Sequence, residues 1–214
     1  MDTRRYSPFD RLVMALDQAL KTLAGPVQTT GRKNPADDQP ETELTGDQKK
    51  LIAGLMRVNH SGEVCAQALY QGQALTAKLP GVREKMERAA IEENDHLEWC
   101  ATRLEELESR PSLLNPLWYA GSFAIGAVAG IAGDKWSLGF VAETEKQVVR
   151  HLDAHLEQIP QQDLRDRAIL EQMRQDEGQH ATQAMNSGGA MLPEPIQKLM
   201  GLTSKIMTKI AFHI

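Results

Sequence analysis

The chain has 214 residues, a net charge of −5 and a hydrophobic content of 41%. This length suits one domain with a full core and leaves room for one more small element. The acidic balance excludes the basic footprint of a nucleic-acid-binding protein, so we expect no nucleic acid among the partners. The two cysteines, Cys65 and Cys100, form neither a C-x-x-C pair nor a zinc spacing, and they fit a reducing compartment.

Residues 1–45 are expected to form an N-terminal helix and a linker, ahead of a main domain at 46–214. Apolar residues recur at helical spacing over 8–23, and Ser7 is a plausible N-cap for this helix. Charged residues interrupt its apolar side, so we expect no signal peptide. Residues 24–45 are rich in Gly, Pro, Thr, Asp and Gln, a composition that predicts an exposed linker.

The main domain is predicted to be all-α, with four long helices arranged as two pairs. The expected ranges are 46–78, 82–109, 135–158 and 162–186. Pro80 and Gly81 separate the first pair, and Gly188 and Gly189 end the second. Helices of this length suit a four-helix bundle with a site at mid-length, and the two pairs need a crossover connection between them.

The predicted crossover contains an apolar segment from Leu117 to Ala132 that carries no charge. Sixteen residues are short for a membrane-spanning helix, which needs about 20. Small residues allow close helix packing within it, namely Gly121, Ala124, Gly126 and Gly130. Two interpretations remain open at this point: a buried core helix, and an interfacial segment that contacts a membrane.

The C-terminal segment 193–214 is predicted to form an amphipathic helix. Its apolar residues at helical spacing are Ile196, Leu199, Met200, Ile206, Met207 and Ile210. Lys198, Lys205 and Lys209 add basic charge, and Glu194 is the one acidic residue of the segment. This pattern is typical of a helix that lies on an anionic membrane surface. A helix that faces a protein partner would look the same.

The most informative feature is a Glu-x-x-His motif that occurs twice, each time after a lone glutamate. The spacing from the lone glutamate to the motif is 30 residues in the first set and 32 in the second. Residues i and i+3 share one face of a helix, so both members of each motif can point at one spot. The six candidate ligands are Glu63, Glu93, His96, Glu145, Glu177 and His180.

This set matches the ligands of a carboxylate-bridged di-iron centre in a ferritin-like four-helix bundle, where one glutamate comes from each of two helices and one Glu-x-x-His from each of the others. Carboxylate oxygen and imidazole nitrogen together suit iron or manganese. A carboxylate has two oxygens and can bridge two ions, so six side chains can hold two metals and leave positions for O2. We therefore predict two iron ions per chain.

A single Glu-x-x-His on an acidic helix is usually part of a solvated face. Two copies, each with a glutamate about 30 residues upstream on its own helix, favour the metal site over this alternative. The other histidines are expected to have lesser roles. His60 lies three residues before Glu63, which reverses the order of the motif. His151 can at best support a ligand from outside the direct set. His155 is a surface or capping candidate, and His213 is near the terminus.

Over about residues 50–214 the chain resembles the demethoxyubiquinone hydroxylase family. The similar segments are 57–63 with 70–73, 93–97, 116–118 with the glycine-rich residues that follow, 141–145 and 176–180. The family's histidine six residues after the third ligand selects Glu145 rather than Glu143, through His151. Residue 152 is Leu where some members have tyrosine, which weakens any aromatic role there. The N-terminal extension resembles the longer bacterial form.

The resemblance implies O2-dependent hydroxylation of a ring carbon of a polyprenyl-methoxy-methyl-benzoquinol, demethoxyubiquinol, in ubiquinone biosynthesis. It implies that Glu93 and Glu177 bridge two irons, that Glu63 and His96 complete one, and that Glu145 and His180 complete the other. The expected partners are a membrane-embedded quinol, O2, an electron donor, the membrane surface and other ubiquinone-biosynthesis proteins. The expected location is the cytoplasmic side of a bacterial inner membrane, as a peripheral protein.

Two rival functions use the same features. A ferritin- or rubrerythrin-like iron oxidase or peroxidase has the same ligand set, but it needs no apolar insertion, and rubrerythrins usually add a C-x-x-C iron site that this chain lacks. A non-catalytic prenyl-lipid-binding protein could use the apolar surfaces, with the glutamates as solvated charges. Metal content tests the second rival, and quinol turnover tests the first.

Overall fold

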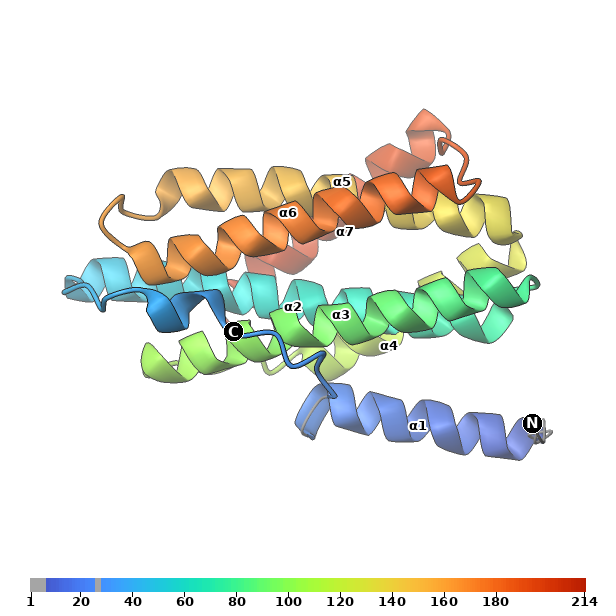
Figure 1. Ribbon diagram of the computed structural model, residues 1–214, viewed down its shortest axis with the longest axis horizontal. Coiled ribbons are helices and arrows are strands. Elements are labelled where there is room, and N and C mark those ends of the chain that lie inside the picture. The colour runs from blue at the N-terminus through green and yellow to red at the C-terminus, as the bar shows by residue number, and fades with distance from the viewer. Residues whose placement is uncertain (1–6, 26–27) are drawn as a thin grey trace.

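The computed structural model describes residues 7–25 and 28–214, which form helices and no strand (Figure 1). The helices are α1 (Pro8–Ala24), the short 3-10 helix η1 (Pro35–Asp38), α2 (Gly46–Thr76), α3 (Pro80–Glu106), α4 (Asn115–Ile131), α5 (Asp134–Gln158), α6 (Leu164–Asn186) and α7 (Glu194–Ala211). The all-α prediction is confirmed. The bounds of the four long helices differ from the predicted ones by no more than three residues.

Four long helices, α2, α3, α5 and α6, run along the long axis of the molecule (Figure 1). α2 packs on α3, α5 packs on α6, and the two pairs meet where α3 contacts α6 and α2 contacts α5. A capping box at Thr45 and Gln48 fixes the start of α2, because each side chain accepts a hydrogen bond from the other residue's backbone N–H. The result is a helical bundle in which the two predicted pairs are neighbours.

Of the apolar clusters among the described residues, two contain residues of all four long helices, one towards each end. Trp99, Leu152 and Met173 belong to the first cluster, and Tyr70 and Val141 belong to the second. On each of the four long helices, the predicted ligands lie in sequence between residues of the first cluster and residues of the second. The polar site therefore has an apolar layer on either side along the bundle, which excludes water from it.

The crossover helix α4 has two different faces. One face lies against α2 so closely that a Cβ atom on Gly72 would be 2.3 Å from the Phe123 carbonyl oxygen, and one on Gly126 would be 2.3 Å from the Leu69 carbonyl oxygen. The opposite face exposes large apolar side chains, with Val128 at 67% and Ile131 at 65% exposure. The fully buried alternative for this segment is therefore wrong.

The small residues of α4 divide in the same way. Gly126 and Gly130 lie in the contact with α2, as predicted. Gly121 has no neighbour that its Cβ would meet within 4 Å, and Ala124 is exposed, so these two take no part in the close packing. The prediction of close packing through small residues thus holds for half of the named positions, because only one side of the helix faces α2.

The segment between α1 and α2 is mostly exposed, as the linker prediction requires, but it is attached to the bundle. Ala36 is buried, and η1 packs on α6. Figure 1 shows this segment running along the bundle after α1. Polar side chains of α3 and α6 hold this exposed segment against the bundle. The division of the chain at residue 45 stays a prediction.

The C-terminal helix α7 contacts α2 and α5 but leaves much of its apolar side open. Leu199, Leu202 and Ile206 are each at least half exposed. Its end is fixed because Arg57 of α2 donates a 2.7 Å hydrogen bond from Nη1 to the Phe212 carbonyl oxygen. Among the described residues, no helix has both the length and the apolar character to cross a bilayer.

The contact between α2 and α4 predicts opposite effects for two substitutions on one helix. Gly126→Ala should lower the free energy of unfolding by about 1–3 kcal/mol, the usual cost of overpacking, because the new Cβ meets the α2 backbone. Gly121→Ala should raise it by roughly 0.5–1 kcal/mol, because alanine there meets open space and suits a helix better than glycine. Denaturant unfolding measures both, and equal effects would contradict the close contact.

Candidate metal centre

The six predicted ligand residues come from four helices and meet in the middle of the bundle. Glu63 lies on α2, Glu93 and His96 on α3, Glu145 on α5, and Glu177 and His180 on α6, and all six are buried. Their potential ligand atoms form two groups, within each of which all atoms lie within 4.8 Å of one another. The groups are Glu63, Glu93, His96 and Glu177, and Glu93, Glu145, Glu177 and His180. Glu93 and Glu177 thus belong to both.

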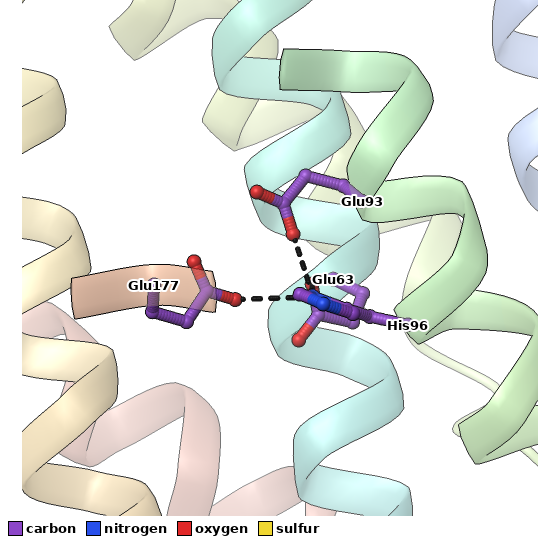
Figure 2. A group of neighbouring side chains, drawn as sticks. All are labelled: Glu63, Glu93, His96 and Glu177. Carbon is purple, nitrogen blue, oxygen red and sulfur yellow. Dashed lines mark hydrogen bonds and ion pairs between the residues drawn. The ribbon is translucent and has the colours of Figure 1, made fainter. Parts of the chain in front are cut away.

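The two histidines present the same ring nitrogen to the carboxylates. His96 Nδ1 lies 3.0 Å from Glu93 Oε2 and 3.2 Å from Glu177 Oε1 (Figure 2). His180 Nδ1 lies 2.9 Å from Glu93 Oε1 and 3.4 Å from Glu177 Oε2. Both inner nitrogens therefore face the two shared glutamates, from opposite ends of the site.

Several of the inner polar atoms lack hydrogen-bond partners. Glu93 Oε1, Glu177 Oε2 and His180 Nδ1 are buried and make no hydrogen bond, although the first and third are only 2.9 Å apart. A buried polar atom without a partner is costly, and such atoms are rare unless an ion or water satisfies them. A cation bound between these atoms would satisfy all three. The donor set of oxygen and nitrogen without sulfur fits iron or manganese.

The ionisation of the site shows how it accommodates four buried carboxyl groups. Burial raises the pKa of Glu63 and Glu145 well above the usual value, and the charges of Glu93 and Glu177 add to this effect. Burial also acts on Glu93 and Glu177, but their contacts with the two histidines outweigh it and lower the pKa of each. Without a metal ion, the protonated forms of Glu63 and Glu145 are therefore favoured. A bound cation would stabilise the ionised carboxylates instead.

The histidines respond in the opposite sense. Burial opposes the charged form of His180, but the carboxylates of Glu177 and Glu93 raise its pKa to about 12. The same balance raises the pKa of His96 well above the usual value, and Asp176 contributes most to the increase. Without a metal ion, the protonated rings supply positive charge to the site.

The outer nitrogen of each histidine meets an acid that sequence reasoning missed. His96 Nε2 lies 2.9 Å from Asp176 Oδ2, and His180 Nε2 lies 2.8 Å from Glu92 Oε2. Asp176 immediately precedes Glu177 in the motif of His180, and Glu92 immediately precedes Glu93 in the motif of His96. The signal in the sequence is therefore an acid-Glu-x-x-His motif that occurs twice. An acceptor at Nε2 fixes the proton there and leaves Nδ1 free to bind a metal.

Glu145 has a further partner on α2. The buried Tyr70 hydroxyl donates a hydrogen bond to Glu145 Oε1. Burial and the Glu145 charge raise the pKa of Tyr70 well above the usual value, so this hydroxyl keeps its proton. Glu143 lies apart from the site: its Oε1 accepts hydrogen bonds from Gln147 at 2.8 Å and Arg150 at 3.4 Å. Of the two neighbouring glutamates, only Glu145 belongs to a ligand group.

The remaining histidines lie outside the two ligand groups. His60 is buried, which lowers its pKa to about 4, and its Nδ1 lies 3.2 Å from Asn115 Nδ2 at the start of α4. His155 is buried and its ring lies 3.8 Å from that of His151, so the expectation of a surface position was wrong. His213 is exposed near the terminus. The reason for the error at His155 is that α5 turns this side chain inward beside Leu152 and Leu156, which are also buried.

The geometry predicts which of the two glutamates on α5 matters for metal binding. Glu145→Gln should weaken iron(II) binding at least ~10-fold, the lower end of the loss found for residues that merely support a ligand. Glu143→Gln removes a charge two residues away and should leave binding unchanged, because its carboxylate accepts hydrogen bonds from Gln147 and Arg150 of α5 and belongs to neither ligand group. Anaerobic iron(II) titration measures both. The assignment is reversed if Glu143→Gln weakens binding and Glu145→Gln does not.

Comparison with known proteins identifies the family. The family described as "Ubiquinone biosynthesis protein COQ7" matches residues 50–211. A 3-demethoxyubiquinol 3-hydroxylase of Acinetobacter baylyi is 58% identical over 211 residues, covering 99% of this chain and 100% of the relative. Proteins of the same name are 56% identical in Nitrosococcus oceani, over all of both chains, and 56% identical in Pseudomonas aeruginosa, over 99% of this chain and 98% of the relative. The chain belongs to the COQ7 family of ubiquinone biosynthesis proteins.

Proposed function

We propose that this protein hydroxylates the ring of demethoxyubiquinol with O2, at a carboxylate-bridged di-iron centre in a ferritin-like bundle. The relatives named 3-demethoxyubiquinol 3-hydroxylase, which match the whole chain, support the reaction. The observation that carries the metal centre is that two buried ligand groups share Glu93 and Glu177. A solvated acidic face would not bury four glutamates and two histidines in one place.

In this proposal the shared glutamates would hold both irons. Glu63 and His96 would complete the ligands of one, and Glu145 and His180 would complete those of the other. When bound, the two irons supply the redox chemistry that O2 requires. The ring C–H becomes C–OH with one oxygen atom of O2, and the other atom leaves as water with two electrons and two protons from a donor.

The contribution of the protein itself is to orient the ligands and to exclude water. Asp176 and Glu92 fix the tautomer of the two histidines, and the Tyr70 hydroxyl fixes one oxygen of Glu145. The apolar clusters at both ends keep the site dry, which strengthens every electrostatic interaction inside it. These residues act by position and need not exchange protons with the substrate.

A small cavity beside Tyr70 and Glu145 is our candidate for the inner end of the substrate path. It lies between α2 and α5, and its other lining residues are Ala66, Leu69, Gln73, Phe140, Val141 and Thr144. Most of these side chains are apolar, as a quinol ring requires. The backbone of Leu69 also contacts Gly126 of α4, so the helix with the exposed apolar face lies directly behind the cavity wall.

The exposed apolar surfaces support a peripheral position on a membrane, and we propose the cytoplasmic side of a bacterial inner membrane. The open face of α4 and the open face of α7 together expose Leu117, Ile125, Val128, Ile131, Leu199, Leu202 and Ile206. The three lysines of α7 are exposed as well and would face anionic lipid headgroups. A polyprenyl quinol resides in the bilayer, so an enzyme that acts on its ring gains from contact with the membrane surface.

Single-turnover assays test the reaction. Reduced, iron-loaded protein with O2 and a short-tailed demethoxyubiquinol analogue should give the ring-hydroxylated product. Glu93→Ala and Glu177→Ala should lose the product below detection, because each removes a ligand shared by both groups. Glu143→Gln should keep most of the activity. Absence of product from the iron-loaded wild type would contradict the proposal, and iron oxidation without product would favour the ferritin-like rival.

Vesicle binding tests the membrane surface. Replacement of Lys205 and Lys209 together by Gln should weaken binding to anionic vesicles by about 30-fold, at roughly 1 kcal/mol for each lysine. Binding to neutral vesicles should change little, because the loss is electrostatic. Flotation at several salt concentrations measures both. Equal losses on neutral and anionic vesicles would contradict an electrostatic contribution from α7.

A further inference from the structure

The segment that follows α1 contacts the side chains directly behind the metal centre. We call residues 28–41 the strap. The Thr30 N–H donates to Asp95 Oδ1 at 2.8 Å, and the Thr30 hydroxyl donates to Asp95 Oδ2. The Gln28 carbonyl oxygen accepts a 2.8 Å hydrogen bond from Asn94 Nδ2. Asp95 and Asn94 immediately precede His96, so the strap is attached at the helical turn that carries this candidate ligand.

Arg32 of the strap joins the two helices that hold the site. Its Nε lies 2.7 Å from Asp95 Oδ2 on α3, and its Nη1 lies 2.8 Å from Asp176 Oδ2 on α6. The guanidinium also lies 5.1 Å from the centre of the Trp99 ring, a favourable position for a cation. One planar fork thus makes three contacts, which a lysine ammonium cannot reproduce with the same geometry.

The oxygen that Arg32 contacts on Asp176 is the one that faces His96. Asp176 Oδ2 lies 2.9 Å from His96 Nε2, and Asp176 Oδ1 accepts a 2.9 Å hydrogen bond from Gln172. Arg32, Asp176 and His96 therefore form a continuous polar chain from the strap to the metal centre. The side chain of Asp176 is held from three directions, which fixes the orientation of the imidazole ring.

The equivalent chain at the other histidine is incomplete. His180 Nε2 contacts Glu92, whose side chain is 39% exposed, whereas that of Asp176 is 10% exposed. Among the side chains that the structure describes, no arginine or lysine forms an ion pair with Glu92. The two motifs are alike in sequence, but Arg32 of the strap pairs with the acid behind His96. The two halves of the ligand set are therefore alike, but the contacts behind the two histidines differ.

We propose that Arg32 is a positioning residue that holds Asp176 and, through it, His96. The strap thereby makes the metal position on the His96 side release its ion more slowly than the position on the His180 side. This inference rests on the proposed metal centre. It assigns to the N-terminal extension a role in holding one of two metal ions. It also makes the two positions chemically different before any substrate binds.

Metal release measures this difference. Iron(II)-loaded wild-type protein mixed with an excess of a strong iron(II) chelator should lose its two ions in two phases of one ion each. Arg32→Gln should speed the slow phase by about 10-fold and leave the fast phase unchanged, since loss of a residue that orients a ligand typically costs 10–100-fold in metal affinity. Arg32→Lys should show a smaller acceleration, because the ammonium keeps the positive charge but cannot reproduce the geometry of the planar fork.

Lys33→Gln is the matched control. Lys33 is the next residue of the strap, is exposed and pairs with Asp38, so its replacement removes the same charge without contact to Asp176. Both release phases should match those of the wild type. Thr30→Val provides a second control, since it removes a hydroxyl bond from the strap to Asp95 but leaves the Arg32–Asp176 pair. A strap that acts only by covering the bundle would make Thr30→Val and Arg32→Gln equivalent.

A spectroscopic measurement separates positioning from general loosening. In Mössbauer spectra of the iron(II)-loaded protein, Arg32→Gln should alter one of two iron signals and leave the other as in the wild type. Equal acceleration of both release phases, or equal change of both signals, would overturn the inference. Two ions bound with release rates unaffected by Arg32→Gln would overturn it while the metal centre stands. A wild-type protein that binds no iron would overturn both.

Discussion

Four glutamate side chains converge in the dry interior of this bundle, and the rest of the structure is arranged around that concentration of negative charge. An unpaired buried carboxylate is costly, and several together repel one another. Two histidines offset part of the charge, and the raised pKa of Glu63 and Glu145 lets protons offset more when no cation is present. The stability of the fold comes from the apolar clusters on either side, which must outweigh the cost of the polar layer between them.

The local features of the site could be predicted from the sequence because they depend on helix geometry alone. Apolar periodicity together with proline and glycine positions located the long helices, and the i, i+3 spacing placed Glu93 beside His96 and Glu177 beside His180. Contacts between helices depend on rotation and packing, which no local pattern contains. Asp176 and His96 are 80 residues apart, and Arg32 and Asp176 are 144 apart. The acid before each motif was visible in the sequence, but its contact with the histidine of the other motif was not.

The crossover segment is a second case in which the local sequence does not determine how a helix packs. A charge-free run of sixteen residues is compatible with burial or with a membrane surface, and composition cannot choose between them. The choice depends on which residues face α2. The close contact at Gly72 and Gly126 turns one side of α4 inward, so its large side chains, such as Val128 and Ile131, face outward. The same contact packs α4 directly on the helix that carries Glu63 and Tyr70, so the exposed apolar surface is only one helix away from the polar site.

The central claim is that the two overlapping ligand groups hold two metal ions that share Glu93 and Glu177. Anomalous diffraction at the iron edge from crystals of the iron-loaded protein tests it most directly. The account predicts two peaks about 3.5–4 Å apart, the usual separation in two-metal sites, each within bonding distance of both shared glutamates. A single peak, or two peaks that do not share these glutamates, would contradict it.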